Sequence, residues 1–383
     1  PESAKPTLPP ALSRVQAASQ QALDKIDLSV ATAAKKLAAV SDMKSDEARK
    51  ILLEMKQAAS FAIDCCVISP EGKMLVVEPA AFKHLEGSDI SKQEHVARII
   101  RTKTPVLSDE FKTVEGIMAA NIEYPIIMAD GKFIGLVSMI FQPHLLLGKV
   151  IPPLIQGIPV EVWAMQKDGL TIYDADADEI GRMLFSDPLY TPFPELLKLG
   201  KRMSAEPNGI GSYKFFKTGT KEQIAKETRW TSIGLHGTEW RLIQTHPMGT
   251  VHKDISHAPV TLDALKKIAG NADLTKALAR NDKESAMTLF KNFAMSFSGV
   301  YSISWIDANC ISQFGYPPEN SLLACDLNKD TTLSGAFCVK SVKAKSEASC
   351  EDTLLEGGRA RFTFVPMNEG DTNLGGLLLI QRL

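Results

Sequence analysis

The sequence has few of the residues that build metal, haem or disulfide sites. Six of its 383 residues are cysteine, and none of them lies in a CxxC, CxxCH or Cys/His pattern. We therefore expect no bound metal and no cofactor. Four of the six cluster late in the chain, at Cys310, Cys325, Cys338 and Cys350. Their spacing fits two interpretations about equally well, disulfide bonds in an oxidising compartment or small buried apolar side chains.

Clustered positive charge and long apolar runs are also missing. The formal net charge is -2 and no run of Lys and Arg stands out, so nucleic acid is not an expected partner. No apolar run approaches the ~20 residues that span a bilayer. The start of the chain, PESAKPTLPP, is typical of a flexible leader. With 44% hydrophobic and 23% charged residues, the rest has the composition of an ordinary globular protein of two or three domains.

The motifs of common enzymes are absent from the sequence. The chain has no G-x-S-x-G, H-E-x-x-H or Walker-type loop. The acidic segment DADADEIG, residues 174–181, has part of the spacing of a calcium loop, but its glycine and glutamate are misplaced. We therefore expect a binding protein rather than an enzyme.

Repeated strand-turn-strand segments are the main feature that the chain does contain. Residues 123–141 and 362–381 each join two apolar runs through a turn built on an acidic residue and glycine. Residues 230–245 turn at His236-Gly237 in the same way. Glycine accepts the positive φ of tight hairpin turns, so these segments predict hairpins. Because an apolar strand entering a polar turn precedes each hairpin, the sequence predicts three copies of one plan. Each copy is expected to hold an antiparallel sheet of about five strands.

Helical periodicity precedes the first and the third copy. An apolar stripe at steps of three and four predicts a long helix over residues 12–40; its members are Leu23, Ile26, Val30, Ala33, Leu37 and Val40. A second helix is expected over residues 45–60, with Ser45 as its N-cap. A helix on one sheet face leaves the other face to the segment between the hairpins. A small-molecule cavity is expected between that segment and the sheet.

This layout resembles the Cache family of extracytoplasmic sensor domains, whose modules share the PAS-like plan. The resemblance rests on the long helix and on three segments that follow it, CVISPEGKMLVVEP, EGSDISKQEHVARIIRTKTPVLSDEF and YPIIMADGKFIGLVSMIF. It implies an α+β fold of tandem PAS-like Cache modules, with antiparallel sheets and a long N-terminal helix. The predicted parts are a leader with helices (1–60), a first module (61–150), a second module (151–252), and a helical lead-in with a third module (253–383).

The resemblance implies a non-catalytic sensor of small molecules outside the cytoplasm, serving signal transduction or chemotaxis. The alternative is a stand-alone periplasmic solute-binding protein. A membrane anchor or transmitter would lie outside this chain, and a homodimer through the apolar stripe of the long helix is compatible with the architecture. The family's amino-acid-binding pattern, an arginine and a tryptophan close together, is absent from residues 87–111. A free amino acid is therefore not the expected ligand.

Candidate ligand-binding residues of the first module begin on the segment SDISKQEHVARIIR. Ser91 is the expected N-cap of a helix that places His95 and Arg98 one turn apart on one face. Such a pair suits a carboxylate, which predicts a small organic acid as the ligand. The alternative is a solvated helix face on which Arg98 pairs with Glu94.

The opposing strand of the first module supplies Asn121, Glu123 and Tyr124. Period-two alternation puts Asn121 and Glu123 on one sheet face and Tyr124 on the other, so only one of these sets can line a cavity. Secondary candidates lie in the third copy, namely Tyr301, Trp305, Arg359 and Arg361. The alternative for the two arginines is an exposed surface pair.

Overall fold

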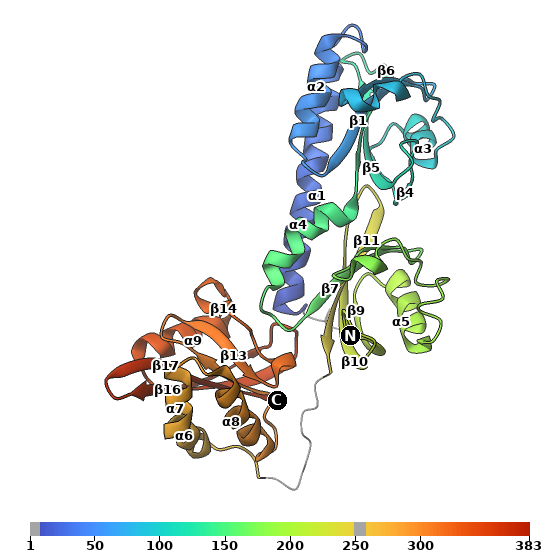
Figure 1. Cartoon of the computed structure of the whole chain (residues 1–383). Coiled ribbons are helices and arrows are strands. Elements are labelled where there is room, and N and C mark those ends of the chain that lie inside the picture. Colours follow the sequence, from blue (N-terminus) through green and yellow to red (C-terminus); the bar gives the residue numbers. More distant parts are fainter. Residues whose placement is uncertain (1–7, 249–257) are drawn as a thin grey trace, which may run out of the picture.

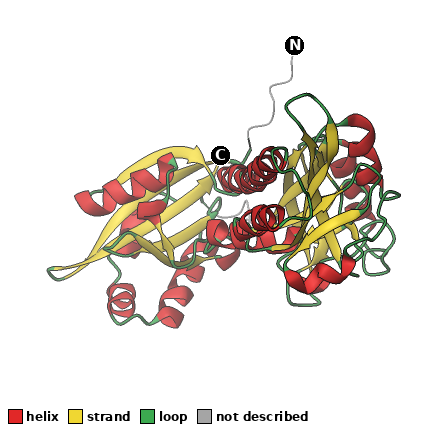
Figure 2. Cartoon of the chain, turned by 90° about the horizontal axis from the view of Figure 1, so that it is seen from above, coloured by secondary structure: helices red, strands yellow, loops and turns green. Residues whose placement is uncertain are grey.

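The protein was examined as a computed structural model that describes residues 8–248 and 258–383. The described residues form three antiparallel sheets with helices on both faces, as Figures 1 and 2 show from two directions. We call the parts built on these sheets the first, second and third modules. Residues 1–7 of the expected leader and the predicted boundary at residue 252 lie outside the described residues. The division into domains by residue number stays a prediction.

The helices and strands follow one another in an order that repeats. Before and within the first module lie α1 (Pro10–Leu37), α2 (Asp46–Gln57), β1 (Ala62–Ile68), β2 (Met74–Glu78), η1 (Ala80–Leu85), α3 (Glu94–Thr102), β3 (Val106–Leu107), β4 (Phe111–Lys112), β5 (Met118–Ile127) and β6 (Phe133–Phe141). The second module has α4 (Pro143–Ile155), β7 (Glu161–Gln166), β8 (Thr171–Tyr173), η2 (Ala177–Glu179), α5 (Pro194–Ala205), β9 (Gly209–Phe216), β10 (Gln223–Leu235) and β11 (Thr238–Pro247).

The third module begins with three helices and ends at the C-terminus. Its elements are α6 (Leu262–Ala269), α7 (Ala272–Ala279), α8 (Lys283–Met295), β12 (Ser302–Ile306), β13 (Ile311–Tyr316), η3 (Pro318–Asn320), β14 (Cys325–Asp326), η4 (Leu327–Lys329), α9 (Leu333–Ala344), β15 (Ala348–Thr353), β16 (Arg359–Glu369) and β17 (Thr372–Arg382).

One strand order is common to the three sheets. The orders are β2-β1-β6-β5-β3, β8-β7-β11-β10-β9 and β13-β12-β17-β16-β15, with β4 added beside β5 and β14 added beside β13. Every described strand pair is antiparallel. The predicted α+β fold with antiparallel sheets and a long N-terminal helix is therefore confirmed.

The predicted hairpins are the central strand pairs of these sheets. β5 and β6 turn at Asp130-Gly131, and β10 and β11 turn at His236-Gly237. Gly131 has φ of +85°, and His236 and Gly237 have φ of +51° and +86°. Since tight hairpin turns require positive φ, the glycine in each turn explains why the chain reverses there.

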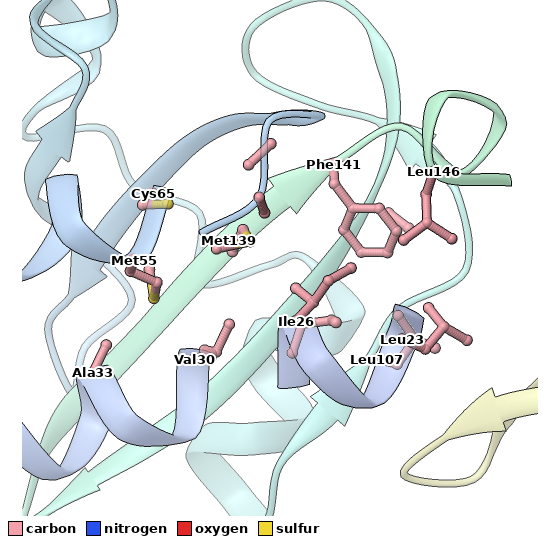
Figure 3. Close-up of a cluster of buried hydrophobic side chains, with 14 of the residues drawn as sticks. Leu23, Ile26, Val30, Ala33, Met55, Cys65, Leu107, Met139, Phe141 and Leu146 are labelled. Carbon is pink, nitrogen blue, oxygen red and sulfur yellow. The ribbon is translucent and has the colours of Figure 1, made fainter. Parts of the chain in front are cut away.

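The apolar stripe of α1 is buried inside the molecule. Figure 3 shows Leu23, Ile26 and Val30 facing Met139 and Phe141 of β6. The stripe already forms the core of the first module, so it is not exposed for the homodimer that the sequence analysis considered. Leu28, on the opposite side of α1, is 68% exposed.

α1 also joins the first module to the second, because it runs past the strands of both (Figure 1). Gln16 Nε2 donates to Thr231 Oγ1 at 2.8 Å, and Gln20 exchanges two hydrogen bonds of 3.0 Å with the backbone of Gly234. One helix thereby fixes two sheets relative to each other.

The second predicted helix is α2, and Ser45 is its N-cap, accepting from Ala48 N at 3.3 Å.

Each sheet separates two apolar cores. In β7, Val162 and Ala164 join the core under α1, whereas Trp163 and Met165 join a core under α5. The reason is the alternation of side chains along a strand.

In each module one segment connects the first two strands of the sheet to its later strands. We call this segment the cover of the module; the covers are residues 79–117, 174–208 and 317–347. In the first two modules, the covers lie on the sheet faces opposite α1 (Figure 1).

The third module touches the other two through backbone contacts. Leu323 N donates to Gly157 O at 2.8 Å, and Ala11 N donates to Leu355 O at 3.1 Å. Gln244 Nε2 of β11 donates to Glu356 O at 3.2 Å. The loop between β15 and β16 therefore contacts both the start of α1 and the last strand of the second module.

All six cysteines lie in the described residues and each is a free thiol. Cys65, Cys66, Cys310 and Cys338 are buried, and Cys325 and Cys350 are partly buried. In this structure the late cysteines are therefore small, largely buried side chains and not disulfide-bonded ones. Among residues 8–248 and 258–383, no helix combines the length and the apolar character needed to cross a membrane.

Candidate functional site

The cover of the first module brings α3 over the sheet. Ser91 is not its N-cap, contrary to the prediction, since α3 begins at Glu94 with Gln93 in the cap position. The physical reason is a tertiary contact: Ile90 N donates to Gly72 O at 2.9 Å, which ties the residues before the helix to the turn between β1 and β2. His95, in the first turn of α3, is 4% exposed and points toward the strands.

A buried hydrogen-bond network links α3 to the sheet. His95 Nδ1 donates to Glu123 Oε1 at 3.0 Å, and Asn121 Nδ2 donates to the same oxygen at 3.0 Å. Ser138 Oγ, on β6, donates to Asn121 Oδ1 at 2.6 Å. Three of the five predicted residues, His95, Asn121 and Glu123, are therefore brought together as expected.

Two further carboxyl groups are buried on the same side of the sheet. Asp64 on β1 is fully buried, and Glu115 lies beside it in the turn before β5. Burial, together with the charge of Glu115, raises the pKa of Asp64 to about 8, and Lys56 offsets a small part of this rise. Within the described residues, both carboxyl oxygens of Asp64, both of Glu115 and Oε2 of Glu123 have no hydrogen-bond partner.

A small cavity lies next to these groups. It encloses about 240 Å³, open solvent at its mouth included, and its wall contains Glu115, Asn121, Ser138, Thr113 and Cys66 together with apolar side chains. Phe111 of β4 closes the side next to α3, with its ring centre 4.5 Å from that of His95. No lysine or arginine lines this cavity among the described residues.

Arg98 lies outside the network. Its guanidinium is about a third exposed, donates to Leu107 O at 3.3 Å, and lies 3.6 Å from Glu94. Arg98 therefore pairs with Glu94, as the alternative interpretation of the sequence proposed. Burial raises the pKa of Asp109 in the neighbouring loop, and the charge of Arg98 opposes that rise.

Tyr124 faces the side of the sheet opposite to Asn121 and Glu123, as the alternation along the strand predicted. Its hydroxyl donates to Asp27 Oδ2 of α1 at 2.8 Å, and His236 Nε2 lies 2.6 Å from Asp27 Oδ1. The three side chains connect the first sheet, α1 and the β10–β11 turn. Tyr124 is therefore a link between modules and does not line the cavity.

Sequence reasoning missed Asp64, Ser138 and Glu115. A signal for the first two exists, because each is a single polar residue inside an apolar strand, in AIDCCVI and GLVSMIF. Buried polar groups of this kind need partners, so a lone one in a central strand indicates a network or a site. Glu115 lies in a loop, where a glutamate is unremarkable, and no local pattern singles it out.

The second and third modules have cavities on the same side of their sheets. In the second module, about 460 Å³ including open solvent lies between the strands and the cover. There Lys226 Nζ binds Glu161 Oε2 at 2.7 Å, and Tyr190 donates to Glu179 at 3.0 Å, so much of the polar lining is already paired. In the third module the corresponding space is about 570 Å³ including open solvent.

The secondary candidates do not form one site. Trp305 faces α8 on the other side of the sheet and donates to Leu374 O at 2.7 Å. Arg359 and Arg361 are exposed and both pair with Glu351, which is the surface pair given as the alternative. Tyr301 is buried, donates to Glu356, and lies 3.1 Å from His246 Nε2 of the second module.

The first-module site offers acceptors rather than cations. Glu115 on the cavity wall, with Asp64 beside it, suits a ligand that has N–H donors, such as an ammonium group. No group of three or more His, Cys, Asp and Glu side chains in the described ranges is arranged to hold a metal ion.

Comparison with known proteins finds a match to a sensor family over the first module. Residues 21–143 match the family described as HK/GC/Chemotaxis protein-like, sensor domain. The chain resembles an extracellular ligand-binding receptor from Desulfohalobium retbaense, with 32% identity, a TM-score of 0.52, and coverage of 61% of this chain and 39% of that chain. It thus spans about two fifths of that receptor's length.

Solved chemoreceptor domains are similar at lower identity. The ligand-binding domain of Campylobacter jejuni Tlp3 with 4-methylisoleucine matches with 14% identity, a TM-score of 0.47, and coverage of 64% of this chain and 91% of that chain. The domain of Pseudomonas aeruginosa PctC with GABA matches with 12% identity, a TM-score of 0.44, and coverage of 61% and 96%. Curated proteins gave no match. The predicted resemblance to sensor domains of the double-Cache type is confirmed.

Proposed function

We propose that this chain, which contains a sensor domain over residues 21–143, is the ligand-binding part of an extracytoplasmic sensor and holds its ligand in the first module. The chain would act by binding and not by catalysis. The match to the sensor family and the similarity to an extracellular receptor support this proposal.

The buried network under α3 is the observation that carries the proposal. His95 comes from the cover, Glu123 from the sheet, and they meet at 3.0 Å with Glu123 fully buried. Leaving a buried carboxyl oxygen without a donor costs roughly 1–3 kcal/mol, and more when the group is charged. Glu123 Oε2 and Asp64 are such groups within the described residues, so a ligand that donates to them would recover this energy.

The ligand that fits these groups is a small molecule with a protonated amine. The organic acid expected from the sequence depended on Arg98, and the structure directs that side chain to Leu107 O and Glu94 instead. A carboxylate entering the cavity would meet Glu115 with no lysine or arginine on the wall, and like charges repel. An ammonium group would be attracted by Glu115.

Strand β5 provides a path from the ligand to the rest of the molecule. Asn121 lines the cavity and Glu123 binds His95 of the cover, while the next residue, Tyr124, binds Asp27 of α1 on the other face. A ligand that draws α3 toward the sheet would shift β5 and with it the contact to α1. The signal would then be a change in the balance between two positions of α1 relative to the sheets.

The experiment that tests the proposal is a ligand screen on matched proteins. Thermal unfolding of the wild type would be measured with primary amines, carboxylates and alcohols of two to six carbons. Glu123→Gln removes the charge but keeps the shape, and Glu71→Gln, in the exposed β1–β2 turn, is the control. A ligand at 100 times its Kd stabilises the protein by about 2.7 kcal/mol.

The expected result is stabilisation of the wild type and of Glu71→Gln by at least one amine, with the effect lost in Glu123→Gln. The proposal fails if the carboxylates stabilise and the matched amines do not. It fails equally if Glu123→Gln responds to the amine as strongly as the wild type does.

A further inference from the structure

The cavity of the third module is separate from the site under α3. It lies on the face of the third sheet away from α6–α8, with its floor on β12 and β17 and its roof on α9. The family match ends at residue 143, well before this part of the chain. Nothing inferred above for the first module requires this space.

Most of the cavity wall is apolar, and a few buried polar groups interrupt it. Ser304, Ser312 and Asn320 are each at most 4% exposed, and Glu356 is 6% exposed. Asn320 Nδ2 donates to Tyr301 O at 2.9 Å, which fixes the amide so that its oxygen is the free end. Asn320 Oδ1 has no hydrogen-bond partner among the residues that the structure describes.

A carboxylate lies on the same wall. Glu356 accepts a hydrogen bond from the Tyr301 hydroxyl, and Asp330 lies on the cover side of the cavity. The described part of the chain places no lysine or arginine on the wall. Arg382, which is not on the wall, lies over the ring of Tyr301 with its guanidinium 4.6 Å from the ring centre.

From these groups we propose that the third-module cavity is a second ligand site, for a small and mostly apolar molecule that carries an amine. The apolar wall would hold the body of the ligand. Its N–H groups would donate to Asn320 Oδ1 and to Glu356. An anionic ligand of the same size would face Glu356 and Asp330 with no cation on the wall, which excludes carboxylates and phosphates.

The location gives this site contact with the other modules. Pro159, from the loop before β7 of the second module, forms part of the wall. His246 Nδ1 donates to Pro159 O at 2.7 Å, and its other ring nitrogen lies 3.1 Å from the Tyr301 hydroxyl. Leu355, also on the wall, accepts from Ala11 N at the start of α1. A bound ligand would therefore touch the junction of the second and third modules.

Calorimetric titration of the full chain with three probes tests the second site. The probes are benzylamine, benzoate and benzyl alcohol, which share a ring and differ in the charged or polar group. Glu356→Gln and Asn320→Leu alter the wall, and circular dichroism and thermal unfolding check that both fold. Glu369→Gln, exposed at the end of β16, is the control within the module, and Glu123→Gln is the control for the first module.

We expect benzylamine to bind the wild type at least tenfold more tightly than benzoate or benzyl alcohol. Glu356→Gln should weaken it at least tenfold, and Asn320→Leu should do the same if it folds. Glu369→Gln should leave this binding unchanged, and Glu123→Gln, which alters the first-module amine site, should keep the binding that Glu356→Gln weakens. If Asn320→Leu does not fold, Glu356→Gln decides alone.

Three results would overturn the second site. One is the absence of benzylamine binding to the wild type, and another is equal binding of benzoate. The third is binding that is lost in Glu123→Gln but kept in Glu356→Gln, which would put the probe in the first module. A failure of this kind leaves the first-module site standing, because that site is judged by its own ligand screen of two- to six-carbon molecules and by Glu123→Gln.

Discussion

The first and third modules have the same strand order but opposite kinds of cavity. In the first module the space beside the sheet is small, and it lies next to a network of His95, Asn121 and Glu123, of which Asn121 lines the space. In the third module the space is larger and mostly apolar, with Asn320 and Glu356 as its buried polar groups. The fold therefore sets where a cavity forms, and side chains on one face of a few strands set what it can bind.

This difference follows from single positions in equivalent strands. β1 carries Asp64 on its cover side, where the equivalent position of β12 is Ser302. β6 carries Ser138 on that side, and β17 carries Leu378 and Ile380. Because alternation keeps the other face of each sheet apolar, under α1 or under α6–α8, these changes alter the cavity without disturbing the core.

The largest effect on this comparison is expected from His95→Leu. It removes one of the two groups that donate to the fully buried Glu123 and leaves Asn121 as the other, and breaking a buried pair usually costs about 3–5 kcal/mol. Scanning calorimetry of the full chain should show the transition of the first module at lower temperature, and hydrogen exchange should assign it. An unchanged transition would mean that Glu123 and His95 do not hold the cover onto the sheet.

A smaller loss is expected from Tyr301→Phe in the third module. The variant removes one hydroxyl that donates to Glu356, and a hydrogen bond to a charged group is worth about 1.5–3 kcal/mol. Hydrogen exchange should increase in residues 354–358 and around His246, where the two modules meet. Arg361→Ala, at an exposed pair, should cause no measurable change in the same experiment. Equal exchange in the two variants would show that the buried contact does not secure the junction.

The pH dependence of Asp64→Asn separates the two modules further. In the folded protein the pKa of Asp64 is raised to about 8 from its ordinary value of 3.8. Between these values the unfolded chain has lost this proton and the folded chain keeps it, so Asp64 lowers stability progressively as pH rises from about 4 to 8. The variant should gain roughly 1–3 kcal/mol over the wild type at pH 8.

Calorimetry at pH 4.5 and pH 8 checks this prediction. At pH 4.5 the difference between Asp64→Asn and the wild type should be much smaller than at pH 8, because pH 4.5 lies less than one unit above the ordinary pKa of 3.8 and the loss of stability grows with each further unit. The third-module transition should not respond to the substitution at either pH. A gain of the same size at both pH values would exclude a raised pKa as its cause.

The sequence by itself determined the elements and the two faces of each sheet. The hairpin turns at Asp130-Gly131 and His236-Gly237 depend on local backbone preferences, and the stripe of α1 depends on a period of 3.6 residues. The separation of Glu123 from Tyr124 depends only on alternation along one strand. Each of these is a property of a few neighbouring residues, so it can be inferred without knowing the rest of the chain.

Only the tertiary structure decided which polar groups meet. Asp64 and Glu115 are far apart in sequence, and their proximity depends on how the cover folds back over β1. The same folding turned Arg98 toward Leu107 and left Ser91 outside α3, because contacts with other segments outweighed the local helix signals. The third-module cavity needs Pro159 from another module. Contacts of this kind depend on the packing of whole elements, and no local pattern encodes them.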